Sequence, residues 1–243
     1  MSAQAVEIKT KDGIAPCHFF SPPHGVRRPA VIFYMDGIGI RQAMVDMGER
    51  LASNGYYVLL PNLYYRAGAV KPFDAATAFK DRLMPLVRSV SAKLVMEDTA
   101  SYLAFLDGQP SVAGGKIGCV GYCLGGGLAL SAAGTFPDRV AAAASFHGGR
   151  LATDQPDSPH LLAPKMRGEI YVGIAGLDTH FTPEEKQRLE STLNAAGVKN
   201  TVEVYPEVKH GFAVNDTPVY DRAAAERHWE QMLALFGRNL HIA

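Results

Sequence analysis

The sequence predicts an α/β fold built on a doubly wound, mostly parallel sheet. Short apolar runs recur along the chain, each of the length of a strand that is buried on both faces. Stretches with the periodicity of amphipathic helices separate these runs, and this alternation is typical of a sheet with helices on both sides. The 243 residues contain no repeat, linker or shift in composition. We therefore expect a single domain over residues 1–243.

The first two strands are expected to form an antiparallel hairpin at the edge of the sheet. Ala5–Thr10 and Gly13–Phe20 alternate apolar and polar residues around the turn dipeptide Asp12-Gly13. The other strands are expected over the apolar runs Ala30–Met35, Tyr56–Leu60, Lys116–Tyr122, Ala141–His147, Glu169–Ala175 and Thr201–Tyr205. Helices are expected over Arg41–Ser53, Val95–Leu106, Leu124–Gly134, Pro183–Ala196 and Ala223–Phe236.

One segment does not fit this regular alternation. Tyr64–Lys93 is amphipathic, but Pro72 and Pro85 interrupt it. We interpret it as an irregular helical excursion, placed where it can overhang the functional site.

The balance of charge disfavours several classes of partner. Lys and Arg total 24, as do Asp and Glu, so no net field attracts nucleic acid or an anionic membrane. The N-terminal segment lacks the pattern of a secretory signal, and no apolar run is long enough to cross a bilayer. Three cysteines fit free thiols in a reducing compartment, with Cys17 and Cys119 inside predicted strands. We expect a cytoplasmic protein with a small-molecule ligand and with neither nucleic-acid nor membrane partners.

The third cysteine lies in a segment typical of a nucleophile elbow. The pattern Gly121-x-Cys123-x-Gly125 connects a predicted strand to an Ala-rich helix. Such a turn holds its nucleophile in a strained conformation, and the glycines let neighbouring backbone approach closely. The helix that follows directs its amide dipoles at the sulfur and places the Leu124 N–H to donate to an oxyanion. The alternative is a glycine-rich turn in which Cys123 is a small buried hydrophobic residue.

A thiol nucleophile needs a base and an acid that orients the base. In α/β-hydrolases the acid follows the nucleophile along the chain and the histidine comes last. Asp178 follows one predicted strand and His210 follows the last one, so we expect both at the edge of the sheet where Cys123 lies. Asp178 alternatively caps a helix, although Thr182 before Pro183 is the better cap.

The other histidines are weaker candidates for the base. His147 ends a predicted strand at the edge of the elbow, so it is a candidate for contact with substrate, the alternative being a histidine without a role in the site. The remainder fall on edges, loops or outer helices, or beside the acid, and solvated surface histidine is the default interpretation for His18, His24, His160, His180, His228 and His241.

Asp36 is a further candidate for the pocket. It follows the strand Ala30–Met35, with the Gly37 N–H as a second oxyanion donor. The alternative is an ordinary Asp-Gly turn. The motifs of zinc and dinucleotide sites are absent from the sequence, so we expect neither metal nor cofactor.

Taken together, these segments resemble the dienelactone hydrolase family. The matching segments are Gly121-Tyr122-Cys123-Leu124-Gly125-Gly126, Asp178 after its strand, His210-Gly211-Phe212 and Leu60-Pro61-Asn62-Leu63-Tyr64. The resemblance implies a Cys-His-Asp triad on an α/β-hydrolase fold that cleaves a small ester or lactone through a thioester. It also implies that no cofactor is needed and that the protein is a monomer or small homo-oligomer, with Tyr64 and Phe212 near the substrate.

Two departures from the family bear on the identity of the substrate. The family has Glu where this chain has Asp36, and that acid pairs with the resting thiol. The family also has a carboxylate-binding Arg four residues after its catalytic His, where this chain has Val214. A second such Arg lies after the fourth strand in the family, and the stand-ins here are Arg66, Arg82 and Arg88.

Two other classes of function compete with an ester hydrolase. One is a ligand-binding or redox-responsive protein that keeps the fold without turnover. The nearer one is a thioesterase or acyltransferase, which uses the same three residue types.

Overall fold

The computed structural model describes residues 3–23, 27–68 and 83–240. Within them, eight strands form one sheet in the order β1-β2-β4-β3-β5-β6-β7-β8. The strands are β1 (Gln4–Lys9), β2 (Ile14–Phe20), β3 (Ala30–Tyr34), β4 (Tyr57–Pro61), β5 (Ile117–Tyr122), β6 (Val140–Phe146), β7 (Glu169–Ala175) and β8 (Asn200–Tyr205). β1 and β2 pair as an antiparallel hairpin, β2 is antiparallel to β4, and the remaining neighbours are parallel. The predicted hairpin and the mostly parallel sheet are therefore confirmed.

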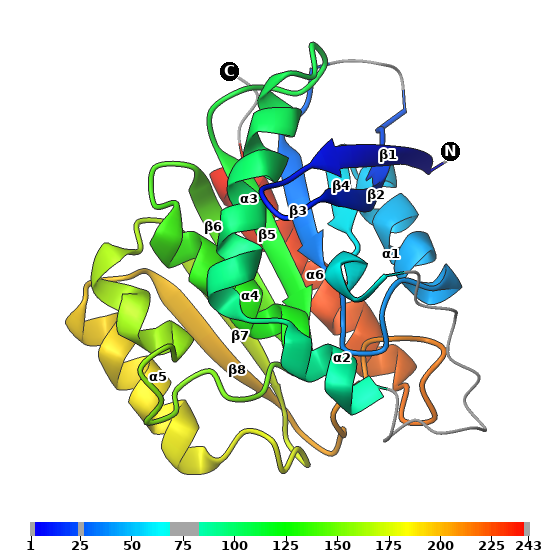
Figure 1. Cartoon of the computed structure of the whole chain (residues 1–243). Helices are drawn as coiled ribbons and strands as arrows, with labels where there is room; N and C mark the ends of the chain where they lie inside the picture. The colour runs from blue at the N-terminus through cyan, green and yellow to red at the C-terminus, as the bar shows by residue number, and fades with distance from the viewer. Residues whose placement is uncertain (1–2, 24–26, 69–82, 241–243) are drawn as a thin grey trace.

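Helices cover both faces of this sheet. They are α1 (Gln42–Ser53), α2 (Met84–Ser89), α3 (Ala92–Asp107), α4 (Leu124–Thr135), α5 (Pro183–Ala195) and α6 (Arg222–Asn239), with 3-10 turns η1 (Tyr65–Ala67) and η3 (Pro159–Lys165). Figure 1 shows α3 and α4 in front of the sheet and α6 behind it. None of the helices in the described ranges has the length and apolar character needed to span a membrane.

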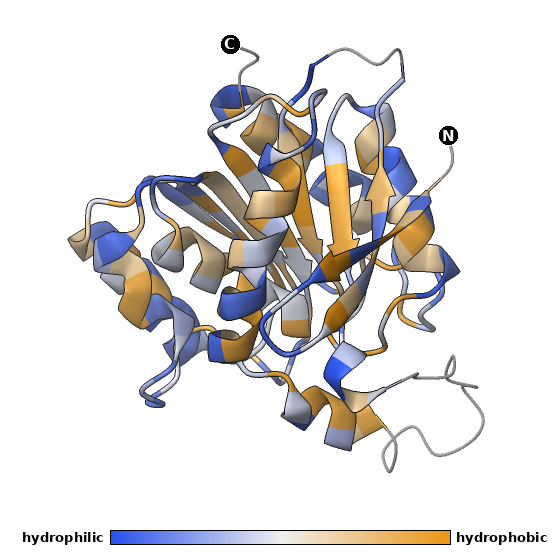
Figure 2. Cartoon of the chain, turned by 45° about the horizontal axis from the view of Figure 1, so that its top comes forward, coloured by the Kyte–Doolittle hydropathy of each residue, from blue (hydrophilic) through white to orange (hydrophobic). Residues whose placement is uncertain are grey.

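The central strands explain the continuous apolar runs in the sequence. β3, β4, β5 and β7 are buried at every position, because helices cover both of their faces. Figure 2 shows the hydrophobic colour along the central strands. β8 lies at the edge of the sheet, and Val204 in it is 43% exposed. The prediction of a buried strand over Thr201–Tyr205 was therefore wrong about its burial, because an edge strand has one neighbour only.

The excursion after β4 lies next to the carboxyl end of β3. Pro85 stands in the first turn of α2, where a missing N–H costs nothing, so it starts this helix instead of breaking it. A methyl group at Gly37 would lie 3.3 Å from the Val87 side chain of α2. α2 thus covers the residue that follows Asp36. Pro72 lies outside the described residues.

Candidate active site

Five loops meet at one edge of the sheet because the strands that precede them run parallel. Tyr34 of β3 is the register partner of Gly121 in β5, and Tyr122 is the partner of Phe146 in β6. On the other side, Ala175 of β7 is the partner of Tyr205 in β8. The residues just past these positions come together at the carboxyl ends of the strands, the edge at which open α/β sheets bind ligands.

Cys123 lies at the turn from β5 into α4 in a strained backbone conformation. Its φ is 53° and its ψ is −114°, a region that residues with a side chain rarely adopt. The Cys123 N–H donates to the Phe146 carbonyl at 3.1 Å, which fixes the turn to β6. A methyl group at Gly125 would lie 2.2 Å from the Tyr34 carbonyl oxygen. Glycine is therefore required there for α4 to begin so close to β3.

Cys123 is also the most accessible of the three thiols. It is partly exposed, whereas Cys17 and Cys119 are buried in the core. Burial raises the pKa of Cys17 to about 12. Burial likewise raises the pKa of Cys119 far above its ordinary value. Neither core thiol has the properties of a nucleophile.

His210 and Asp178 form a short hydrogen bond at this edge. His210 Nδ1 lies 2.6 Å from Asp178 Oδ2, and the Asp178 side chain is 1% exposed. Burial acts to lower the pKa of His210, but hydrogen bonds to Asp178 and Cys123 outweigh it and raise that pKa to about 10. Burial acts to raise the pKa of Asp178, but the bonds from His210 and His180 hold it below its ordinary value. Asp178, His210 and Cys123 are thus brought together from three separate loops.

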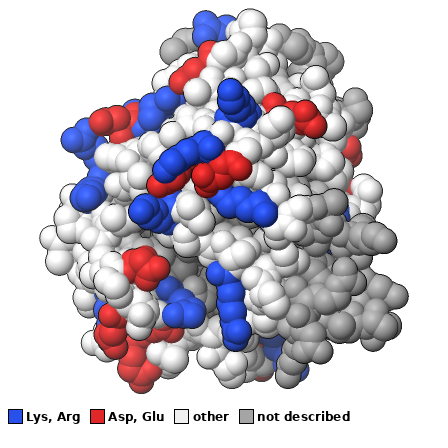
Figure 3. Space-filling model, viewed as in Figure 1, with Lys and Arg blue, Asp and Glu red and all other residues white. Residues whose placement is uncertain are grey.

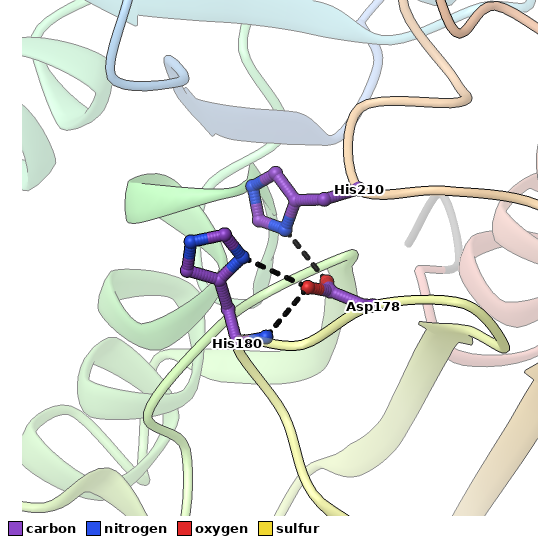
Figure 4. Close-up of side chains that lie close together, drawn as sticks. All are labelled: Asp178, His180 and His210. Carbon is purple, nitrogen blue, oxygen red and sulfur yellow. Dashed lines mark hydrogen bonds and ion pairs between the residues drawn. The ribbon is translucent and has the colours of Figure 1, made fainter.

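His180 lies on the same carboxylate, which the sequence analysis did not anticipate. Its backbone N–H is 2.8 Å and its Nδ1 is 3.0 Å from Asp178 Oδ1. The ring centroids of His180 and His210 are 4.9 Å apart, and Figure 4 shows both rings turned to Asp178. The ring is exposed, as expected of a surface histidine, whereas the same expectation is wrong for His160 and His228, which are buried. The signal in the sequence was the spacing Asp-x-His, which places both side chains on one short loop.

His147 is buried against His210 with no hydrogen bond to its ring. It follows β6, is 1% exposed and has a φ of 39°. Neither ring nitrogen has a partner among the described residues. The centroid of the ring lies 5.1 Å from that of His210 and 5.6 Å from that of Phe212, both edge to face. Burial and the neighbouring His210 hold the pKa of His147 well below its ordinary value, so this ring is neutral.

The Asp36 carboxylate binds the Arg41 guanidinium and not the Cys123 thiol. Arg41 Nη1 and Nη2 lie 2.8 and 2.9 Å from the two Asp36 carboxylate oxygens. The backbone N–H groups of Ile38 and Gly39 donate to the same carboxylate, and Arg41 also binds Asp216. Among the described residues no hydrogen bond joins Asp36 to Cys123. The sequence analysis treated Arg41 only as the start of a helix and missed this pair.

Tyr64 holds Gly37, the residue whose N–H is the second expected oxyanion donor. Its buried hydroxyl donates to the Gly37 carbonyl at 2.6 Å. Burial, together with the charges of Asp36 and Cys123, raises the pKa of Tyr64 well above its ordinary value. This hydroxyl therefore stays protonated and holds the Gly37 peptide in place beside the elbow.

The arginine candidates for a substrate carboxylate differ in their availability. Arg66 donates to both oxygens of buried Asp98 at 2.7 and 2.8 Å and also binds Asp12, so it is already neutralised. Arg88 is exposed on α2 and has no hydrogen bond or ion pair among the described residues. Arg82 lies outside the described residues.

The loop after His210 places apolar side chains at both of the positions for which the sequence predicted a place near the substrate. Phe212 and Val214 are both fully buried, and Phe212 stacks on Tyr205 with centroids 5.0 Å apart. The Val214 N–H donates to the Gly211 carbonyl, in a turn that Gly211 makes with a φ of 97°. Neither side chain offers a charge.

Comparison with known proteins assigns the chain to a family. The model of the dienelactone hydrolase family matches residues 18–240. The chain belongs to this family. The family is one of carboxylic ester hydrolases, and the carboxymethylenebutenolidase of Pseudomonas putida is 27% identical over 229 residues, covering 93% of this chain and 92% of the relative.

Solved structures show that this hydrolase has the family's α/β-hydrolase fold. A dienelactone hydrolase-like promiscuous phosphotriesterase from metagenomic libraries matches it with a TM-score of 0.83 at 22% identity, covering 99% of each chain. The dienelactone hydrolase of Anabaena variabilis matches with a TM-score of 0.71 at 17% identity, again over 99% of each chain.

The Asp178–His210 bond predicts a pH-dependent contribution to the stability of this hydrolase. The folded pKa of His210 is raised from 6.5 to about 10, so the ionic part of this stabilisation is fully present below pH 6.5 and is lost as pH rises through 10, where the neutral ring keeps one N–H to donate. The pKa of Asp178 lies below its ordinary 3.8, so the bond is also lost in stronger acid. Asp178→Asn should therefore lower the free energy of unfolding by ~1.5–3 kcal/mol between these limits.

Urea unfolding of both proteins at a series of pH values measures this difference. Asp157→Asn, which removes an exposed carboxylate, is the matched control and should change little. A difference between native protein and Asp178→Asn that stays constant up to pH 10 would contradict the assignment.

Proposed function

We propose that this hydrolase cleaves a small ester or lactone, with Cys123 as nucleophile, His210 as base and Asp178 as the acid that orients His210. One observation carries the proposal. The His210 ring interacts with the Asp178 carboxylate through one nitrogen at 2.6 Å and also with Cys123 at the elbow. A base held between an acid and an activated thiol is the arrangement that acyl transfer requires.

In the proposed reaction, the resting state is a Cys123 thiolate beside a protonated His210. The thiolate attacks the acyl carbon, and the N–H groups of Leu124 and Gly37 stabilise the oxyanion. His210 then gives its proton to the leaving alkoxide, and a thioester remains. Next, His210 removes a proton from water, and the hydroxide attacks the thioester. Collapse of this second intermediate releases the acid and restores the thiolate and the protonated His210.

Other functions on the same fold are less well supported. A non-catalytic binding or redox-responsive protein has no need for a buried acid bonded to the histidine beside its thiol. A thioesterase or acyltransferase would use the same residues, and dependence of the product on an added alcohol or thiol acceptor would identify transfer.

Cys123→Ala should lower kcat/KM for an activated aryl ester by at least about a hundredfold while leaving the thermal unfolding midpoint unchanged. The reason is that the substitution removes one partly exposed sulfur and no core contact. Cys17→Ala is the control and should keep its activity. Steady-state hydrolysis assays and differential scanning calorimetry make both measurements. Retention of most activity in Cys123→Ala would remove this residue from the reaction.

We further propose that the His147 ring makes a hydrogen bond to the bound acyl group. A buried polar group without a partner costs free energy, so a protein retains one where function uses it. His147 lies against the proposed base and next to Phe212, at the edge where substrate must bind.

His147→Phe should therefore raise the free energy of unfolding by ~1–3 kcal/mol, because it removes unpaired buried nitrogens, and lower kcat/KM about tenfold or more. Tyr102→Phe is the matched control, since it removes an unpaired buried hydroxyl from α3, outside the proposed site. It should gain stability and keep its activity. If His147→Phe kept full activity as well, the ring would have only a packing role.

The charges near the site favour a neutral substrate. Val214 is buried and apolar, and Arg66 is neutralised by Asp98 and Asp12. Figure 3 views the face over α3 and α4, where basic and acidic side chains are interspersed over most of the surface, so this face has no broad charge of one sign. With Arg88, exposed on α2, as the remaining candidate cation, the buried Val214 and the neutralised Arg66 support a neutral ester or lactone over a carboxylated one.

We expect kcat/KM for a carboxylated lactone to exceed that for its neutral methyl ester by no more than about tenfold, because a bidentate Arg contact worth ~1.5–3 kcal/mol is missing. Hydrolysis of the paired substrates by native protein and by Arg88→Gln measures the ratio. A thousandfold preference for the anion that Arg88→Gln removes would identify Arg88 as the missing cation.

A further inference from the structure

We propose that Asp178, His180 and His210 form a binding site for Zn²⁺, and that the bound ion reversibly inhibits this hydrolase. Each residue offers one ligand atom, and these atoms lie within 4.8 Å of one another. Two imidazoles and a carboxylate are ligands that Zn²⁺ prefers, and three protein ligands with one open position make up an accessible zinc site.

The two histidines are already held around the carboxylate. Asp178 Oδ2 lies 2.6 Å from His210 Nδ1, and Oδ1 lies 3.0 Å from His180 Nδ1, so each ring presents the same nitrogen to the carboxylate. Figure 4 shows the two rings on one side of it. Around a tetrahedral zinc ion, neighbouring ligand atoms are about 3.3 Å apart. The two ligand atoms that are furthest apart therefore have to approach each other by about 1.5 Å at most. Rotation of the exposed His180 side chain can supply this movement.

The route for the ion is open on the His180 side. The His180 side chain is 67% exposed, whereas Asp178 is 1% exposed. His180 and Asp178 lie on the same short loop after β7, and the His180 backbone N–H donates to Asp178 Oδ1 at 2.8 Å. The backbone of His180 is thus held against Asp178, so only the exposed ring has to move, which reduces the entropy lost when the ion binds.

The inhibition rests on the proposed function, whereas the binding does not. A zinc ion on His210 Nδ1 replaces the proton of that nitrogen, which is released to solvent, and leaves the remaining proton on Nε2. Such a ring has no free nitrogen with which to remove a proton from water. The thioester would then not be hydrolysed until the ion is removed. The ion is an inhibitor in this proposal and takes no part in catalysis.

Binding is tested by isothermal titration calorimetry of Zn²⁺ into Cys123→Ala protein freed of metal by a chelator. This background removes the rival site, a zinc ion held by the Cys123 thiol and His210. We expect one ion per chain, and we expect His180→Gln in the same background to weaken binding at least about tenfold. Glutamine retains a donor for Asp178 but is a poor zinc ligand. His18→Gln removes a distant histidine in β2 and should leave the binding unchanged.

Inhibition is tested with the native thiol present. The rate of ester hydrolysis by native protein, His180→Gln and His18→Gln is measured against Zn²⁺, each relative to its own rate in EDTA. The half-inhibiting concentration should rise at least about tenfold in His180→Gln only, EDTA should restore the rate, and Mg²⁺ at the same concentrations should not inhibit, since it prefers oxygen ligands.

The outcomes separate the two proposals. Zinc binding that is lost in Cys123→Ala, or that is equally tight in His180→Gln, overturns the site. A protein without ester hydrolysis that still binds zinc through His180 refutes the proposed function and leaves the site standing.

Discussion

The hydrogen bond between Asp178 and His210 is the interaction on which the site depends. It joins the loop after β7 to the loop after β8 at 2.6 Å, with the carboxylate 1% exposed. The backbone prepares this contact, because the Gly176 N–H donates to the Tyr205 carbonyl and the Leu177 N–H to the Val208 carbonyl. The parallel register of β7 and β8 thus continues into their loops. His180 lies on the Oδ1 oxygen of this buried acid, and the His210 imidazole is the partner of its Oδ2 oxygen.

Backbone strain gathers at the same edge of the sheet. Four residues other than glycine have a positive φ in the described part of the chain, namely Cys123, His147, Arg150 and Glu207, and all four follow β5, β6 or β8. Each such residue costs on the order of 1–3 kcal/mol, which the packing of the buried central strands has to offset. This distribution supports the carboxyl edge as the proposed functional edge without reference to any motif. The unpaired nitrogens of His147 add to the cost at that edge.

The sequence predicted most of the fold because its signals are local. Apolar runs, helical periodicity and the Gly-x-Cys-x-Gly turn each depend on neighbouring residues, and the observed elements begin and end within a few residues of the predicted ones. The exposure of β8 and the Asp36–Arg41 pair were missed, since both depend on tertiary position or side-chain direction. His180 was dismissed for a related reason: its exposure was foreseen, but the direction of its ring was not. The roles of Cys123, His210 and Asp178 remain predictions of the same sequence argument.

The pairing of Asp36 with Arg41 bears on how the proposed thiolate is kept ready. Asp36 accepts two hydrogen bonds from Arg41 and two from backbone N–H groups, so its oxygens are occupied and its charge is compensated. Since no hydrogen bond joins Asp36 to Cys123 among the described residues, His210 is the group that exchanges a proton with Cys123 in the proposed reaction. Because Cys123 is not paired with Asp36, no anionic substrate is needed to separate the thiol from this acid. The Asp36–Arg41 pair and the buried Val214 therefore both support the neutral class of substrate proposed above.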